Sequence, residues 1–304
     1  MLKYFILGLS MLTFTVSAYD APPQVMVTIK PIHALVSGVM AGVDKPLMLL
    51  RGGESPHNYS LRPSQVRQLH AANLVIWVSP NVETFLEKII STLSSKTQIL
   101  RLVDVPDLML LKIREGGIWK THRHSDFHHT QDTQDPHIWL DPRNAKVIVQ
   151  AVAHSLSQID RKNASHYMAN ATRLIKQLEQ LDQELQYQLM PIKHIPFLVF
   201  HDAFQYFEHR YELNAVGSIS LSPETRLSVK RLYQLRHHLK KQQVRCVFSE
   251  PQLESTLITT LIENTSVQRG ILDPLGMELT PGKEAYFTLL RNLVKSITQC
   301  LMTN

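Results

Sequence analysis

The sequence lacks the short motifs that mark the common hydrolase and nucleotide-binding classes. None of HExxH, GxSxG and the glycine-rich P-loop occurs in its 304 residues. It also lacks a block of Lys and Arg. The formal charge of +6 comes from 32 basic and 26 acidic residues that are spread along the chain, without interleaved aromatic residues. This charge pattern argues against nucleic-acid binding.

The remaining composition is that of an ordinary globular protein. Hydrophobic residues make up 44% of the chain and charged residues 19%, which is unlike a disordered or fibrous sequence. A chain of 304 residues exceeds the size at which a single core usually stops growing. We therefore expect two lobes.

The N-terminus carries an apolar run that is too short for a comfortable membrane span. Lys3 precedes this run, which extends from Tyr4 to Val16, and the small residues Ser17 and Ala18 are typical of a cleavage site. We predict that residues 1–18 are a cleaved signal peptide and that the mature protein is exported, soluble and without a stable membrane anchor. An uncleaved anchor is the alternative. No cysteine lies near the cleavage point, so a lipoprotein anchor is not available.

Cysteine is scarce, with only Cys246 and Cys300 in the chain. An even pair in an exported protein favours a disulfide bridge, because the compartment is oxidising. The bridge would close a loop of about 55 residues, and this constraint on the unfolded chain would stabilise the folded protein by roughly 4 kcal/mol. A reactive or metal-binding thiol pair is the alternative, but the CxxC spacing typical of such pairs is absent.

Short β-branched runs alternate with helical patterns up to residue 159, and the alternation starts afresh after Pro191 and Pro196. This order predicts an α/β fold with two lobes, each built on a mainly parallel sheet flanked by helices. We expect an N-terminal lobe over residues 19–159, including a His-rich loop at 114–135, and a C-terminal lobe over residues 191–304.

A linking helix is predicted between the lobes, at residues 160–190. Leucines at alternating three- and four-residue steps from Leu174 to Leu189 indicate one long amphipathic helix that begins near Asp160. About thirty residues at 1.5 Å each would span roughly 45 Å, which is longer than a small domain is wide. We expect a rigid strut that joins the lobes. An ordinary surface helix or a coiled-coil dimer seam is the alternative.

Histidine is concentrated between Arg114 and Pro142, where five residues fall within sixteen positions. Imidazole is the commonest protein ligand for borderline metals, so the stretch suggests metal handling. The five are His122, His124, His128, His129 and His137. The first four lie in a polar loop, whereas His137 lies in the compact segment PHIWLDP.

Three histidines stand at comparable places in the predicted fold, each shortly before a helix. His57 follows a glycine-rich loop ahead of a helix, His137 precedes the predicted helix at Arg143, and His201 ends the strand PFLVF. Ligands in open α/β sheets collect at the carboxyl ends of strands. The three side chains therefore predict a metal site between the lobes, and three imidazoles with an open fourth position suit Zn²⁺.

Five segments, in this order, resemble one protein family: PHNYSLRPS, DPHIWLDPRNA, FHDAFQYFE, VFSEPQ and LDPLG. The family is the periplasmic solute-binding protein of high-affinity zinc ABC importers, the ZnuA-like family. The resemblance covers nearly all of the mature chain. It implies that His57, His137 and His201 bind Zn²⁺ as transported cargo. It also implies a periplasmic location and delivery to a membrane permease of the ABC class. We expect a monomer.

The fourth ligand stays open at this point. Some zinc-binding relatives have an acidic residue directly before the first histidine, where this chain has Pro56. Water, Glu54 and Asp273 of LDPLG are the candidates, although LDPLG fits a strand-ending turn equally well. The loop histidines form either a weak auxiliary zinc site or a solvated insertion.

Three other functions remain as alternatives. One is a manganese or iron carrier of the same fold, although the manganese- and iron-binding members of the family that this chain resembles typically have a carboxylate where it has His201. A surface adhesin is a second possibility. A zinc hydrolase would need a general base, for which Asp202 is conceivable, although an N-cap or a supporting role beside the metal fits Asp202 better. We expect no enzymatic activity.

Overall fold

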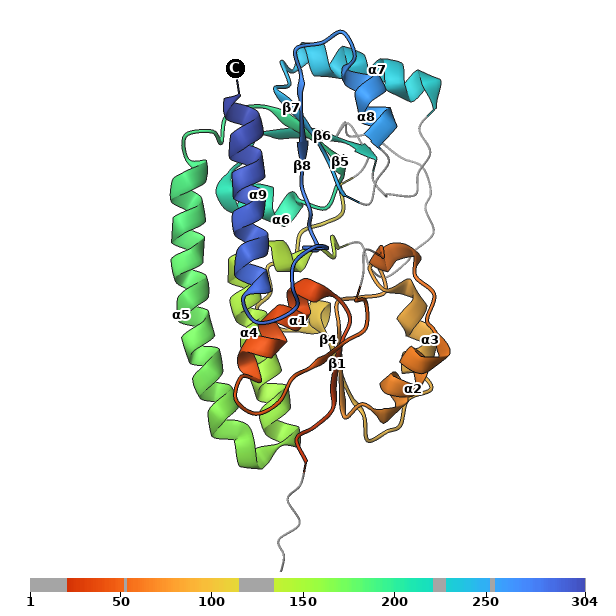
Figure 1. Ribbon diagram of the computed structural model, residues 1–304, viewed down its shortest axis with the longest axis vertical. Coiled ribbons are helices and arrows are strands. Elements are labelled where there is room, and N and C mark those ends of the chain that lie inside the picture. Colours follow the sequence, from red (N-terminus) through yellow and green to blue (C-terminus); the bar gives the residue numbers. More distant parts are fainter. Residues whose placement is uncertain (1–20, 52–53, 115–133, 221–227, 252–254, 304) are drawn as a thin grey trace, which may run out of the picture.

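The computed structural model describes residues 21–51, 54–114, 134–220, 228–251 and 255–303. Two four-stranded parallel sheets form the framework (Figure 1). The first sheet has the order β2-β1-β3-β4 and the second the order β6-β5-β7-β8. Both sheets therefore repeat the same strand order, and the predicted fold class is confirmed. The strands are β1 Val25–Val27, β2 Leu47–Met48, β3 Leu74–Trp77, β4 Gln98–Arg101, β5 Phe197–His201, β6 Ala215–Ser220, β7 Cys246–Ser249 and β8 Gln268–Ile271.

Helices connect the strands, as the alternating pattern predicted. The α-helices are α1 Lys30–Val39, α2 Pro63–Ala71, α3 Glu87–Ile90, α4 Pro142–Ile159, α5 Ala164–Leu189, α6 Gln205–Tyr211, α7 Val229–Lys241, α8 Ser255–Ile262 and α9 Ala285–Met302. Proline at the first or second position begins α1, α2 and α4, where its fixed φ suits the first turn. The connection between β3 and β4 contains only short helical segments, the 3₁₀ turn η2 (Thr84–Leu86) and the single-turn α3.

The long linking helix is α5, with 26 residues and a length of about 39 Å. Its predicted leucine stripe is buried along the whole helix. The helix begins four residues later than Asp160, because the chain first makes the 3₁₀ turn η5 (Arg161–Asn163). The Asp160 carboxylate accepts hydrogen bonds from the side-chain amide of Asn163 at 2.7 Å and from the Tyr167 hydroxyl at 2.7 Å, which fixes the corner between α4 and α5.

A second helix also connects the two halves. The last helix, α9, packs against α1 of the N-terminal half and against α5 and β8 (Figure 1). Its apolar face, including Leu290 and Leu293, belongs to a core cluster that continues from the first sheet to the second. The predicted bridge between Cys246 and Cys300 is confirmed and fastens α9 to β7, with a Cα–Cα distance of 6.2 Å. The two lobes therefore share one continuous core.

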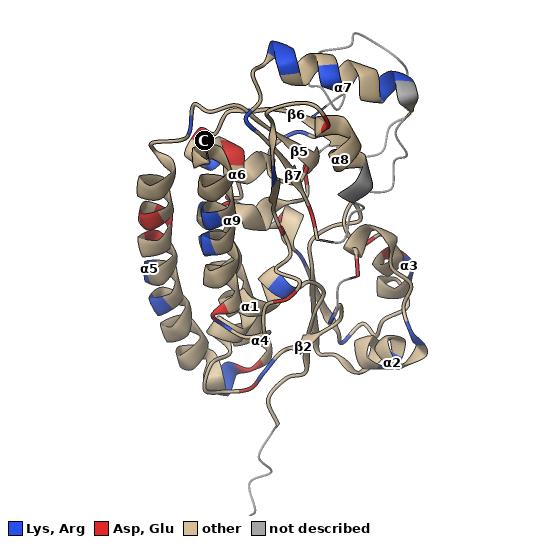
Figure 2. Ribbon diagram, turned by 45° about the horizontal axis from the view of Figure 1, so that its top comes forward, with Lys and Arg blue, Asp and Glu red and all other residues tan. Residues whose placement is uncertain are grey.

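The helix α7 carries basic residues on a solvated face (Figure 2). Lys230, Lys240 and Lys241 are exposed, whereas Leu235 and Leu239 are buried beneath them. Among the described residues, no helix is long and apolar enough to cross a membrane. The predicted signal peptide lies outside the described residues.

Candidate metal site

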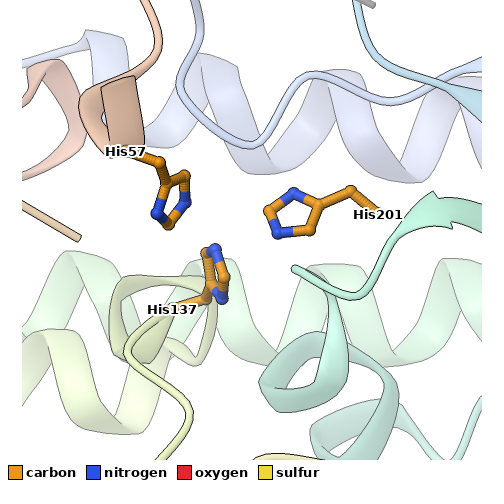
Figure 3. Close-up of side chains that lie close together, drawn as sticks. All are labelled: His57, His137 and His201. Atoms are coloured by element: carbon orange, nitrogen blue, oxygen red, sulfur yellow. The ribbon is translucent and has the colours of Figure 1, made fainter. Parts of the chain in front are cut away.

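Three imidazole rings converge between the two sheets. His57, His137 and His201 each offer one nitrogen, and these nitrogens lie within 4.8 Å of one another. The ring centroids are 5.1 to 5.7 Å apart. Figure 3 shows the three rings pointing toward one common space. The sequence-predicted trio is therefore brought together from segments that are far apart in the chain.

Local structure presents each ring. His57 lies in the 3₁₀ turn η1 (Pro56–Asn58), where the Ser55 hydroxyl caps the turn by accepting from the His57 amide at 3.3 Å. His137 directly precedes the 3₁₀ turn η4 (Ile138–Leu140). His201 is the last residue of β5, at the carboxyl edge of the second sheet. The edge rule for parallel sheets accounts directly for His201.

Each ring is fixed through its Nδ1 atom. His57 Nδ1 lies 3.1 Å from the Asn81 carbonyl oxygen, His137 Nδ1 2.8 Å from Asp135 Oδ1, and His201 Nδ1 3.1 Å from Glu250 Oε1. All three partners are hydrogen-bond acceptors, so each Nδ1 is the protonated donor. The Nε2 lone pair is then left for a metal, which is the arrangement that metal-binding histidines use.

Burial sets the charge of the rings. The pKa of His57 falls to about 3 because burial disfavours the charged form and because His137 and His201 would add like charge. The His57 ring is therefore neutral at neutral pH. Burial lowers the pKa of His201, but the Glu250 carboxylate, together with the charges of Asp202 and Asp135, outweighs burial, so the pKa of His201 is raised overall.

The space between the rings is small. Its volume is about 10 Å³, on the scale that one water molecule or one ion requires. In a tetrahedral zinc site, with Zn–N bonds of about 2.05 Å, ligand nitrogens lie roughly 3.3 Å apart, so the rings need to approach only slightly. The lining residues are Ser55, Pro56, His57, His137, Trp139, His201, Glu250, Pro274 and Leu275.

The two carboxylates considered as fourth ligands are engaged elsewhere. Asp273 caps the turn after β8, where its oxygens accept from the amides of Leu275 at 3.0 Å, Gly276 at 2.8 Å and Met277 at 2.6 Å. Glu54 lies 4.0 Å from Arg62. Neither belongs to the group formed by the three imidazoles among the described residues. The fourth position stays a prediction, and the four loop histidines lie outside the described residues.

Sequence reasoning missed the carboxylates that support the rings. Asp135 stands two residues before His137, and Glu250 follows β7 at the same sheet edge where His201 ends β5. That shared edge was the available signal for Glu250. The N-cap role expected of Asp202 is wrong, because the residue at the N-cap of α6 is Phe204. Asp202 instead forms an ion pair with Arg114 at 3.1 Å.

Comparison with known proteins identifies the family. A sequence model described as "Zinc-uptake complex component A periplasmic" matches residues 25–300. The chain is 38% identical to the high-affinity zinc uptake system protein ZnuA of Brucella abortus, over 91% of each chain, and 33% identical to that of Yersinia pestis, over 92% of each.

Solved structures agree with this result. A crystal structure of ZnuA matches with a TM-score of 0.78 at 22% identity, and covers 92% of this chain and 99% of that chain. The Zn(II)-bound AdcA of Streptococcus pneumoniae matches with a TM-score of 0.73 at 26% identity, over 93% of this chain and 58% of that chain. The protein belongs to the ZnuA family of periplasmic zinc-uptake components.

Proposed function

We propose that this protein captures Zn²⁺ outside the cytoplasm and delivers it to an ABC-type membrane permease. The observation that carries the proposal is the group of three imidazoles, each held through Nδ1 so that Nε2 faces one small space. The curated relatives are named as zinc uptake proteins. The family is described as periplasmic, and we assign residues 1–18 to a cleaved signal peptide and the mature chain to a monomer without a membrane anchor.

The donor set favours zinc over manganese or iron. The fold alone does not select the metal, because a Pseudomonas aeruginosa solute-binding protein solved with Mn²⁺ has the same fold, with a TM-score of 0.78 at 18% identity. Imidazole nitrogen suits Zn²⁺, whereas Mn²⁺ prefers carboxylate oxygen. The Asp135 and Glu250 carboxylates accept hydrogen bonds from ligand rings. Three imidazole nitrogens are therefore the donors that face the space for the ion.

Transport requires binding and release but no reaction of the ion. The family consists of components of an uptake system, and we propose that this protein is not an enzyme. Asp202, the conceivable base of a hydrolase, is held by the Arg114 guanidinium. Proton competition for the imidazoles provides a route to release.

Large rotation of the lobes is disfavoured, because α5 and α9 both pack along the shared core. We propose that metal binding instead orders the segments around His57 and His137 through small shifts. In this proposal the two lobes are residues 19–159 and 191–304, and the linking helix at residues 160–190 joins them. Solution scattering with and without zinc is expected to show no large contraction.

The proposal is tested with protein purified without chelator. Elemental analysis is expected to find zinc bound, and single alanine variants of His57, His137 and His201 are expected to lose it in competition titrations. The matched control is His154→Ala, since His154 is an exposed histidine on α4 whose ring contacts Gln158. Equal zinc binding by the three site variants and the control would refute the proposal.

The loop histidines need a separate experiment. We propose that His122, His124, His128 and His129 form a weak auxiliary site that passes zinc to the cleft. A variant without residues 121–132 is expected to bind one ion fewer than the full chain. One ion per chain in both proteins would reject the auxiliary site and leave the main site unaffected.

A further inference from the structure

The hydroxyl of Tyr206 connects the C-terminal half to the segment that carries His137. Tyr206 lies on α6 and is completely buried. Its hydroxyl donates to the Asp135 carbonyl oxygen at 2.7 Å and accepts from the Leu111 amide at 3.0 Å. Asp135 and Leu111 are themselves paired, since the Asp135 amide donates to the Leu111 carbonyl oxygen at 2.8 Å. One hydroxyl therefore holds two neighbouring backbone segments.

Asp135 transmits this contact to the metal site. Its Oδ1 atom accepts from the His137 amide at 3.0 Å and faces His137 Nδ1 at 2.8 Å. Asp135 is 3% exposed, so water does not replace a lost partner easily. A rigid Asp135 keeps the Nδ1 proton of His137 in place, and the Nε2 lone pair then points into the cavity.

The same helix also lies next to His201, the second proposed ligand. α6 begins four residues after His201, so the helix and this imidazole are joined by a short connection. Arg114, near Leu111 in sequence, also contacts α6 through Glu208 at 2.6 Å. The distance between His137 and His201 therefore depends on the contacts that α6 makes with the segments at Leu111 and Asp135.

We propose that Tyr206 is a positioning residue that sets the zinc affinity of the site by holding Asp135, and through it the His137 ring. This inference rests on the proposed function, because it assigns His137 to zinc binding. Loss of the hydroxyl leaves the Asp135 carbonyl and the Leu111 amide without their shared partner. The Asp135 side chain then moves more freely, and His137 samples rotations and tautomers that do not bind the ion.

The test variant is Tyr206→Phe, and Tyr211→Phe is its matched control. Tyr211 lies on the same helix, is 4% exposed, and its hydroxyl donates to Asp182 Oδ1 on α5 at 3.1 Å. Both variants remove one buried, hydrogen-bonded hydroxyl, but only Tyr206 contacts Asp135. We expect Tyr206→Phe to weaken zinc binding about 10- to 100-fold, mainly through faster release. Tyr211→Phe is expected to bind zinc like the wild type.

A double-variant cycle separates positioning from general destabilisation. If Tyr206 acts through Asp135, adding Tyr206→Phe to Asp135→Asn weakens binding by much less than it does alone. Nitrogen-15 spectra of the metal-free protein provide an independent readout. His137 is expected to be protonated at Nδ1 in the wild type and in Tyr211→Phe, and to show a mixture of tautomers in Tyr206→Phe.

The outcomes distinguish this inference from the proposed function. Wild-type affinity in Tyr206→Phe, full additivity with Asp135→Asn, or an equal loss in Tyr211→Phe would each overturn the positioning role. If His137→Ala bound zinc normally, the proposed site itself would fail. Should Tyr206→Phe not fold, para-aminophenylalanine at Tyr206 keeps a donor to the Asp135 carbonyl. That protein is expected to bind zinc nearly as tightly as the wild type, and a loss as large as that of Asp135→Asn would contradict the inference.

Discussion

The buried pair of His201 and Glu250 provides the sharpest quantitative prediction. Both side chains are about 5% exposed or less, and His201 Nδ1 lies 3.1 Å from Glu250 Oε1. Glu250→Gln keeps an acceptor oxygen in nearly the same place and removes only the negative charge. Because the charge makes the ring a more basic ligand, its loss is expected to weaken zinc binding about tenfold, or roughly 1.4 kcal/mol. Glu250→Ala, which also removes the acceptor, is expected to lose about 100-fold.

The pH dependence of this loss follows from the sign of the pKa shift. Glu250 raises the pKa of His201, so protons compete with zinc in the wild type from a higher pH than they do in Glu250→Gln. The difference in zinc affinity between the wild type and Glu250→Gln should therefore be largest near pH 8 and become smaller towards about pH 5.5. Competition titration with a zinc-binding dye measures it, with Glu184→Gln as the control, since Glu184 pairs with Arg291 between α5 and α9. An affinity difference that is absent near pH 8, or constant over this range, would refute the reasoning.

Three further predictions concern stability. Replacing Cys246 and Cys300 by Ser should lower the free energy of unfolding by about 4 kcal/mol, since the bridge closes a loop with a sequence separation of 54, and urea titration measures this. Leu181→Ala removes a fully buried side chain of α5 and should cost about 2–5 kcal/mol in the same assay, whereas Met190→Ala, at an exposed position, should cost little. Burial raises the pKa of Glu83 from 4.5 to about 7, so the folded protein holds this proton more tightly than the unfolded chain does. The Glu83 contribution to stability is therefore full below pH 4.5 and is lost as the pH rises through about 7. Glu83→Gln should flatten that part of the stability profile, and an unchanged profile would exclude Glu83 as its source.

The alternation of strands and helices was predictable because parallel strands buried on both faces form short apolar runs between amphipathic helices. The juxtaposition of His57, His137 and His201 was predictable for a related reason, since His57 and His137 stand in connections ahead of helices and His201 ends a parallel strand. The start of α5 was not predictable to the residue. The turn at Arg161–Asn163 depends on hydrogen bonds to Asp160 that sequence periodicity does not encode.

The groups that hold the ligands were harder to find. Asp135 and Glu250 act through contacts with rings from the same turn or a neighbouring strand, and a carboxylate at such a position is more often a turn or capping residue. Tyr206 carries no sequence signal for its role, because a tyrosine on the buried face of a short helix is usually a packing residue. The segment LDPLG was consistent with Asp273 as a metal ligand and equally with a strand-ending turn. The three backbone amide hydrogen bonds to Asp273 match the turn.

The packing of α9 against α1 has a consequence for how the chain folds. These two helices lie near opposite ends of the described chain, so the shared core cannot close until nearly all residues are present. Contacts of such large sequence separation are slow to form, since a long loop must close first. A chain is synthesised from its N-terminus. The N-terminal half of this protein therefore cannot complete its packing until α9 is present, and the bridge between Cys246 and Cys300 then fixes α9 to the completed fold.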